Sequence, residues 1–348
     1  MKQKILSLLV LVLLPALFLA SCTKTLVTKK SALAVNNIGT GDTAVSTVNT
    51  GLYQYIATDK NGNIYGLTMH QAYTGADTIY KIDAAGNKTF FYASLQTPGT
   101  DTVVIQTQLS CLTADSLGNV YTLSYNNATK IQDVIKISPA GSESVFFSNI
   151  SQTLSDIQKI LIDNSGTLYY YNNEGIRKVA PGGTPTTIYS GVSTFALDNA
   201  GNIYFFKTAS IAANGNVSLE LVRMNPAGVV TVLDNNQGSG FLAQNGQLVN
   251  IIDDIAVDNH GNVFVGNLSQ YVNANSWTAK NIIYEISRTG IVTTLLPGTN
   301  GHVDGPLATA KIGRTISMIT DGSGNLYFSE TASNYFPGTG SYIRKVTF

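Results

Sequence analysis

The sequence predicts an all-β protein: a β-propeller of six four-stranded antiparallel blades, whose last blade is completed by an N-terminal strand. Three observations support this prediction. The composition favours strands and turns, with 32 Gly and 18 Tyr in 348 residues. A strand–turn–strand phrase recurs six times, and a second such phrase comes after each of the first five copies. Four-stranded units repeated around an axis are the blades of a propeller.

Charged side chains are scarce and balanced. They make up 12% of the residues, with 21 Lys and Arg against 21 Asp and Glu, whereas an average globular domain carries about 25%. Nucleic-acid-binding proteins usually present a basic stripe, and disordered chains usually carry a high net charge. The composition therefore predicts a folded protein whose partners do not include nucleic acid.

The N-terminus has the pattern of a targeting signal. Lys2 and Lys4 precede a nearly continuous apolar run over residues 5–20. This run has 16 residues, fewer than the roughly 20 that an apolar helix needs to cross a bilayer. A positive start, an apolar middle and a small-residue end are typical of a secretory signal peptide. We therefore expect residues 1–21 to be removed from the mature protein.

The end of this signal, residues 19–22, reads Leu-Ala-Ser-Cys and resembles a bacterial lipobox. The resemblance implies lipidation of Cys22, and two or three acyl chains anchor a protein more firmly than one. Residues 22–41 are then a lipid-anchored tether, and residues 42–348 form the propeller. The acids that mark surface export in some Gram-negative bacteria are absent after Cys22. This favours the periplasmic side of the outer membrane and leaves surface exposure open.

Lipidation of Cys22 would leave Cys111 as the other of the 2 cysteines, so that no intramolecular disulfide could form. Cys111 lies in an apolar strand pattern. We expect a buried, inert thiol there rather than a nucleophile.

The first repeated phrase is an apolar strand, a short turn that opens with Asp and contains Gly, and a second strand, as in residues 56–65. An Asp carboxylate can accept hydrogen bonds from the next backbone amides, and Gly accepts a positive φ without steric strain. We therefore interpret the repeated Asp residues as turn formers and not as metal ligands. They are Asp59, Asp115, Asp163, Asp198, Asp258 and Asp321.

The second phrase is an apolar strand, a Gly turn and a Thr- and Val-rich strand; residues 79–86 are the strand and turn of its first copy. The two phrases together supply four strands to each unit. The sixth unit ends with the chain after its third strand. Residues 42–49 resemble the fourth strands of the other units, so we expect them to close the ring and cover two sheet edges.

The last unit resembles the NHL-repeat family of six-bladed propellers. The resemblance rests on Asp304-Gly305-Pro306, on residues 321–327 and on residues 343–346, and more loosely covers residues 51–348. The Pro that usually opens the first strand of an NHL repeat is absent, since residues 314–316 read Arg-Thr-Ile.

The long connections are predicted to lie on one face of the propeller, and they include residues 207–218 and 268–281. Loops on a rigid scaffold commonly carry function. We expect ligand-binding residues where the first strand of each blade enters from that face, five positions before each repeated Asp. These candidates are Gln54, Ser110, Gln158, Ser193 and Asp253, with Asp254 beside the last and Ile316 at the sixth position.

The same loops carry aromatic side chains, including Trp277 and Tyr335. Aromatic rings beside Asn, Gln and Ser suit contacts with a sugar or a peptide, although packing within the protein is the alternative interpretation. The sequence contains no HExxH, CxxC or Gly-x-Ser-x-Gly motif. It therefore identifies no catalytic residue.

The preferred interpretation is a lipid-anchored extracytoplasmic binding module that engages a glycan, peptide or protein on the long-loop face, without a cofactor. One alternative is a calcium-dependent hydrolase, because six-bladed calcium lactonases resemble this architecture. That resemblance implies oxygen ligands at the channel mouth, for which the candidates are Asp253, Asp254, Gln54, Gln158 and Glu330. A second alternative is a structural partner in an envelope assembly.

Overall fold

The structure is a computed structural model. It describes residues 43–348 with the exception of residues 69–75, 95, 99–102, 106, 152–156, 173, 212–216, 234–251, 274–275, 298–300 and 332–340. Strands are its regular elements, and none of the described residues belongs to a helix long and apolar enough to span a membrane.

Five blades are built from consecutive strands, paired in chain order and all antiparallel. Blade 1 consists of β2 (Tyr53–Thr58), β3 (Ile64–Thr68), β4 (Thr78–Ile82) and β5 (Lys88–Ala93). Blade 2 consists of β8 (Thr107–Ala114), β9 (Val120–Asn126), β10 (Ile131–Ile137) and β11 (Glu143–Ser151). Blade 3 consists of β12 (Ile157–Ile162), β13 (Leu168–Asn172), β14 (Gly175–Val179) and β15 (Thr186–Tyr189). Blade 4 consists of β16 (Val192–Leu197), β17 (Ile203–Ile211), β18 (Val217–Met224) and β19 (Val230–Val232); blade 5 of β20 (Ile252–Val257), β21 (Val263–Asn273), β22 (Ser276–Ile286) and β23 (Val292–Leu296). The short strands β6 (Gln96–Pro98) and β7 (Val103–Ile105) pair with each other outside the blades.

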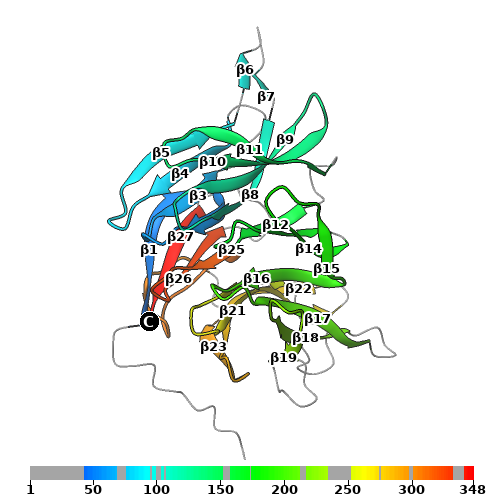
Figure 1. The fold of residues 1–348 in the computed structure, drawn as a ribbon. Helices are drawn as coiled ribbons and strands as arrows, with labels where there is room; N and C mark the ends of the chain where they lie inside the picture. The colour runs from blue at the N-terminus through cyan, green and yellow to red at the C-terminus, as the bar shows by residue number, and fades with distance from the viewer. Residues whose placement is uncertain are drawn as a thin grey trace, which may run out of the picture. The chain divides into compact units, whose positions relative to one another are not determined.

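Blade 6 joins the two ends of the described chain. It contains β25 (Arg314–Thr320), β26 (Leu326–Thr331), β27 (Ser341–Thr347) and, as its fourth strand, β1 (Ala44–Gly51). In Figure 1 the blue β1 lies beside the red β27. The two-residue strand β24 (Gly305–Pro306) pairs with the other edge of β1. The prediction that an N-terminal strand completes the last blade is therefore confirmed.

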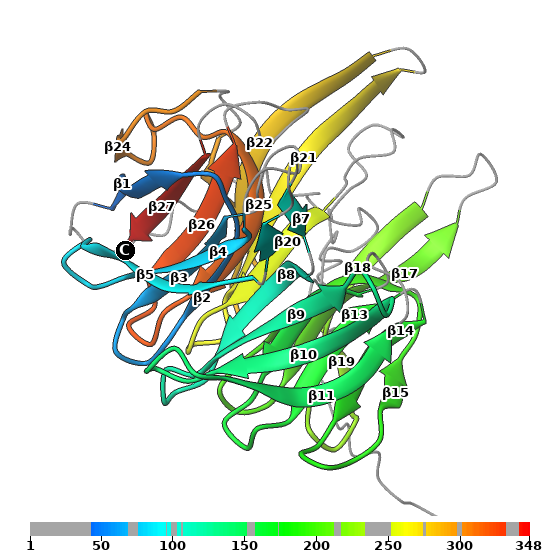
Figure 2. The same cartoon turned by 90° about the horizontal axis from the view of Figure 1, so that it is seen from above.

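The blades form a closed ring around their first strands. Each first strand contacts the first strand of the next blade, and β25 of blade 6 contacts β2 of blade 1 (Figures 1 and 2). The apolar core consists of separate buried clusters, and each cluster joins two neighbouring blades. Tyr65 of blade 1 packs with Leu112 and Ile135 of blade 2, for example. Burial between blades thus stabilises the ring, since apolar burial contributes about 25 cal/mol per Å².

The repeated Asp residues form the turns between the first and second strands, as predicted. In blade 4, Asp198 Oδ1 accepts the backbone N–H groups of Ala200 and Asn202 at 2.9 and 2.8 Å. Its Oδ2 accepts the Asn202 amide and the Tyr204 hydroxyl. Gly201, in the same turn, has φ +79°, a conformation that glycine adopts without strain. These carboxylates are occupied by their own turns.

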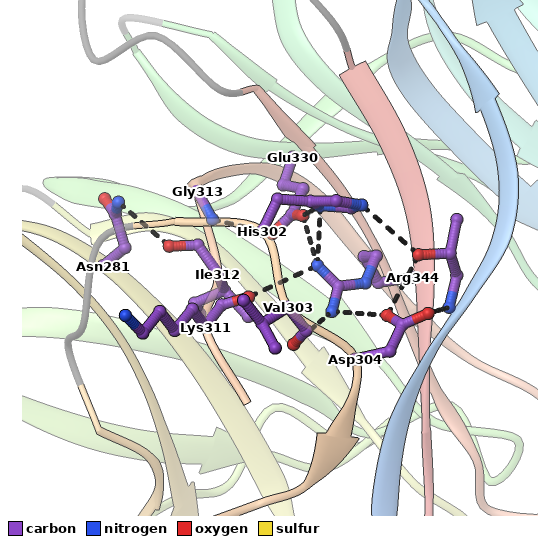
Figure 3. Close-up of polar contacts among 10 residues, drawn as sticks. Asn281, His302, Val303, Asp304, Lys311, Ile312, Gly313, Glu330 and Arg344 are labelled. Atoms are coloured by element: carbon purple, nitrogen blue, oxygen red, sulfur yellow. Dashed lines mark hydrogen bonds and ion pairs between the residues drawn. The ribbon is translucent and has the colours of Figure 1, made fainter. Parts of the chain in front are cut away.

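Side chains also hold the closing strand, in a cluster that we call the closure clasp: Thr47, His302, Asp304, Glu330 and Arg344. Figure 3 labels the last four. Arg344 is fully buried and donates to Glu330 at 2.5 Å and to Asp304 at 2.8 Å. Asp304 accepts hydrogen bonds from the backbone N–H and the hydroxyl of Thr47 at 2.9 and 3.0 Å. Nδ1 of His302 lies 2.6 Å from Glu330 Oε1. The clasp therefore ties β1 to β27 and to the connection that enters blade 6.

Two connections that the sequence predicts as loops are largely strands. Residues 207–211 and 217–218 extend the hairpin β17–β18, and residues 268–273 and 276–281 extend the hairpin β21–β22. Both hairpins project from their sheets in Figure 2. In blade 5 the pairing runs on to Tyr271 opposite Trp277. Val, Tyr, Trp and Thr favour strands, and a hairpin satisfies its own backbone hydrogen bonds. The loop prediction was wrong for most of these residues.

Candidate functional site: the channel cavity

A β-bulge interrupts the pairing of the first and second strands in every blade, close to the predicted ring positions. The pairing register skips Gln54 in blade 1, Gln158 in blade 3 and Asp253 in blade 5. It skips Cys111 in blade 2, residues 193–194 in blade 4 and Ile316 in blade 6. A bulge re-aims the side chains around it. The bulges therefore determine which side chains the first strands present to the central channel.

Behind the bulges lies a cavity of about 140 Å³ in the channel. Every blade contributes to its wall the residue four positions before its repeated Asp. We call these six residues the channel ring: Tyr55, Cys111, Lys159, Thr194, Asp254 and Ser317. All six carry a polar or ionisable group.

Some of the predicted site residues lie at or near this cavity. Gln158, Asp253 and Asp254 line it, as does Ile316. Gln54 and Ser110 immediately precede ring members, at positions 55 and 111. Ser193 lies in β16 and Trp277 in β22, and the structure describes the backbone of both residues. Cys22 and Tyr335 lie outside the described residues.

Lys159 and Asp254 meet across the channel from blades 3 and 5. The ammonium group of Lys159 donates to Asp254 Oδ1 at 2.5 Å and to the carbonyl of Ile255 at 2.9 Å. Asp254 also accepts the backbone N–H groups of Ile255 and Met318, both at 2.8 Å. Lys159 lines both this cavity and a second one of about 200 Å³ on the side of the Asp turns. Lys159, held by Asp254, is thus one of the residues that the two cavities share.

Asp253 forms a second ion pair, with Arg314. Its Oδ1 accepts from Arg314 Nη2 at 3.0 Å, and its side chain is 5% exposed. Its Oδ2 is buried and has no hydrogen-bond partner among the described residues. Burial raises the pKa of Asp253 to about 6, although the Arg314 guanidinium acts to lower it. Asp253 therefore contributes a buried carboxylate with one unpaired oxygen to the residues around the cavity.

Cys111 is buried, as predicted, and its φ of +54° is unusual for a residue other than glycine. Its Sγ lies 3.8 Å from the carbonyl oxygen of Ile157. Burial raises the pKa of the thiol to about 12, against a smaller lowering by Lys159. Because the thiolate is the nucleophilic form, burial and the raised pKa disfavour reaction of this thiol at neutral pH.

Three of the calcium-ligand candidates of the lactonase-like alternative, Asp253, Asp254 and Glu330, have partners within the protein. Calcium takes roughly six to eight oxygen ligands from several groups. Both Asp253 and Asp254 are already paired with cationic side chains. Glu330 belongs to the closure clasp, where it also accepts the Gly313 N–H at 2.8 Å. Among the described residues no group of three or more His, Cys, Asp or Glu is placed to hold a metal.

Asp254 is the one channel-ring residue among the sequence candidates; the others were placed one position earlier, and neither cation was among them. The bulge shifts the inward-facing register by one residue, so the ring lies four positions before each Asp rather than five. A polar residue at that position in all six copies was the available signal. Lys159 and Arg314 gave no local signal, because their partners are 95 and 61 positions away.

Comparison with known proteins supports the assignment of the fold. No protein-family model matches the chain, and no curated protein does. A calcium-binding protein, regucalcin, from Agrobacterium tumefaciens is 14% identical, with a TM-score of 0.53, covering 87% of this chain and 94% of its own. A gluconolactonase from Xanthomonas campestris is 8% identical, with a TM-score of 0.50, covering 88% and 91%. A luciferin-regenerating enzyme is 11% identical, with a TM-score of 0.51, covering 87% and 95%. At these identities the likeness is one of fold, the six-bladed β-propeller.

Proposed function

We propose that this protein is a lipid-anchored binding module of the bacterial cell envelope, which holds part of a glycan, peptide or protein ligand in the channel cavity. The observation that carries the proposal is the charge pairing of the cavity. Lys159 pairs with Asp254 and Arg314 with Asp253, and this leaves a polar pocket of molecular size. Small-molecule sites are usually larger and mostly apolar, and this cavity shares with them the few convergent polar groups.

The location is part of the proposal. The signal-peptide pattern of residues 1–21 and the lipobox at Cys22 support an anchor on the periplasmic side of the outer membrane. Cys22→Ala should move the protein from the membrane fraction to the soluble fraction. Protease treatment of intact cells should leave the wild-type protein uncut, and cleavage would instead indicate surface exposure.

Ligand binding is tested with the mature lipidated protein in detergent, by its thermal unfolding in a panel of oligosaccharides and peptides. A ligand at about 100 times its dissociation constant stabilises the folded state by roughly 2.7 kcal/mol. We expect at least one glycan or peptide to raise the unfolding temperature. Gln158→Trp, at an exposed position of the cavity wall, should abolish that shift without lowering the unfolding temperature of the free protein.

A calcium-dependent lactonase-like hydrolase is the second candidate, and one observation favours it: the fold is like that of a gluconolactonase and of a calcium-binding regucalcin. Stabilisation by calcium, lost in Asp253→Ala and accompanied by lactone hydrolysis, would favour it over the binding module. Stable co-purification of one envelope protein, with no small ligand, would instead favour a structural role in an assembly.

A further inference from the structure

The second cavity, on the side of the Asp turns, has a volume of about 200 Å³, and we call it the turn cup. Each of the six turns contributes its Asp and the residue that follows it to the lining. These following residues form the rim of the cup: Lys60, Ser116, Asn164, Asn199, Asn259 and Gly322. The repeat itself therefore builds the cup, with one turn from each blade.

The wall of the turn cup is largely apolar. Leu161, Ile162, Leu197 and Ile319 line it, and each of these residues is only partly buried. Covering such apolar surface is favourable. The cavity of about 200 Å³ is larger than the roughly 150 Å³ of an apolar cavity, in another protein, that holds one benzene molecule. The cup therefore has room for the side chain of one Phe or Leu.

One buried polar group in this wall has no partner. Thr113 lines the cup and is 3% exposed, and its hydroxyl makes no hydrogen bond to any residue that the structure describes. The hydroxyls of Thr58 and Thr320, which also line the cup, donate to backbone carbonyls at 3.2 and 2.6 Å. Buried hydroxyls are usually hydrogen-bonded. The free hydroxyl of Thr113 therefore indicates that a polar group of a ligand completes the site.

The charges around the cup favour cationic groups at its rim. Six carboxylates line it, one from each turn, against two ammonium groups, those of Lys60 and Lys159. Within the described part of the chain, five of these carboxylates have no ion-pair partner, and Asp258 has His260 at 3.8 Å. The neutral donors of the turns leave the carboxylates charged, and cations of the third strands such as Lys81 do not line the cup. Lys or Arg side chains of a ligand would thus meet complementary charge.

The rim offers hydrogen bonds that suit a peptide backbone. Asn199 donates to Asn259 at 3.0 Å, and Asn259 donates to the carbonyl of Gly322 at 2.6 Å. The exposed side chain of Asn164 has no such partner among the residues described. A side-chain amide can donate and accept at the same time. Asn164 can therefore pair with both the C=O and the N–H of an extended segment.

From these observations we propose that the turn cup is a docking site for a partner protein. A segment of the partner inserts one apolar side chain among the six turns and places Lys or Arg residues on either side of it over the rim. This site is separate from the channel cavity, and the inference does not depend on the function proposed above.

The test is isothermal titration of the mature protein with acetylated and amidated pentapeptides. The main probe has Phe at its centre, Lys on each side and Gly at both ends. One control peptide carries Glu in place of both Lys residues, and a second carries Ser in place of Phe. We expect the main probe to bind at least about fivefold more tightly than either control peptide. Its binding should weaken at about 1 M salt, where the Debye length is about 3 Å.

Substitutions at the rim locate the binding. Asn164→Trp should abolish it by covering the cup, and Asn164→Lys should weaken it at least about twofold by adding a cation. The matched controls are Ser148→Trp and Ser148→Lys, which should leave the affinity unchanged. Both positions are exposed, and Ser148, in β11, lines neither cavity.

The other outcomes would each overturn the inference. Equal binding of all three peptides would contradict the apolar and basic character of the partner segment. Binding of the main probe that Asn164→Trp retains and Gln158→Trp abolishes would place the peptide in the channel cavity and keep the function proposed above. Binding of 2-phenylethylamine as tightly as the main probe would assign the cup to a small amine. An absence of binding by every probe would also overturn the inference, and it would leave the channel cavity untouched as a site.

Discussion

Asp304 and Thr47 are separated by 257 positions in the sequence and joined by two hydrogen bonds, one to the backbone N–H and one to the hydroxyl of Thr47. The contact holds the fourth strand of blade 6 against the connection that leads into the same blade. Arg344 holds Asp304 in turn, at 2.8 Å. The ring is thus closed by a polar clasp as well as by the pairing of β1 with β27.

Arg344→Met should destabilise the protein strongly. The substitution removes the cation that faces buried Glu330 and exposed Asp304. Loss of one partner of a buried pair, here Arg344 and Glu330, typically costs about 3–5 kcal/mol. Denaturant unfolding of the two proteins measures the difference. Arg177→Met, in a partly exposed pair, is the control and should change stability by less than about 1 kcal/mol. Equal effects of the two substitutions would contradict the role assigned to the clasp.

Deletion of residues 43–51 should open the ring. The edge of β27 would lose its partner, and Val45 would leave the core shared by blades 5 and 6. Exposed strand edges promote association, so we expect oligomers in size-exclusion chromatography with light scattering. Addition of a peptide with the sequence of residues 42–51 should restore the elution position of the undeleted protein. A deletion variant with the same elution position and unfolding temperature as the undeleted protein would show that β1 does not close the ring.

Lys159→Met should destabilise the protein because it leaves Asp254 buried without a cation. The expected loss is about 3–5 kcal/mol. Adding Asp254→Asn should recover part of it, since the buried charge is then gone. A double-mutant cycle measured by denaturant unfolding gives the coupling. Additive effects of the two substitutions would mean that the residues do not interact across the channel.

The pH dependence of stability should report the buried state of Asp253. Its pKa is about 6 in the folded protein, against about 3.9 in an unfolded chain. Because the pKa of Asp253 is higher in the folded protein, its protonation adds to the free energy of unfolding. This contribution is complete below about pH 4 and is lost as the pH rises through 6. Wild type should therefore lose on the order of 2–3 kcal/mol relative to Asp253→Asn between pH 4 and 8. Parallel pH profiles of the two proteins would contradict this assignment.

Gly324→Ala should destabilise the last Asp turn, because Gly324 has φ +84°. A side chain in that conformation costs about 1 kcal/mol or more. Gly322→Ala is a control in the same turn: its φ lies outside this range, and a Cβ there meets nothing within 4 Å. Thermal unfolding should show a lower unfolding temperature for Gly324→Ala alone. An equal decrease for both variants would point to a general loss of turn flexibility.

Most of the fold could be predicted from the sequence repeat. The six Asp turns, the four strands of each blade and the completion of the last blade by β1 all derive from local patterns, because turns and strands depend on neighbouring residues. The inward register could not be derived in this way, because a bulge shifts it by one residue and leaves no distinct local signature. The pairings of Lys159 with Asp254 and of Arg314 with Asp253 depend on blades far apart in sequence, and only the closed ring brings them together.

The most direct test of the central claim, that the channel cavity is a binding site, is a thermal-shift comparison of the wild-type protein with Gln158→Trp. Both are measured with calcium, the oligosaccharide panel and the peptide panel. The account predicts a shift with a glycan or peptide that Gln158→Trp abolishes, and no shift with calcium. A shift with calcium that Asp253→Ala abolishes, with no shift from any glycan or peptide, would contradict it.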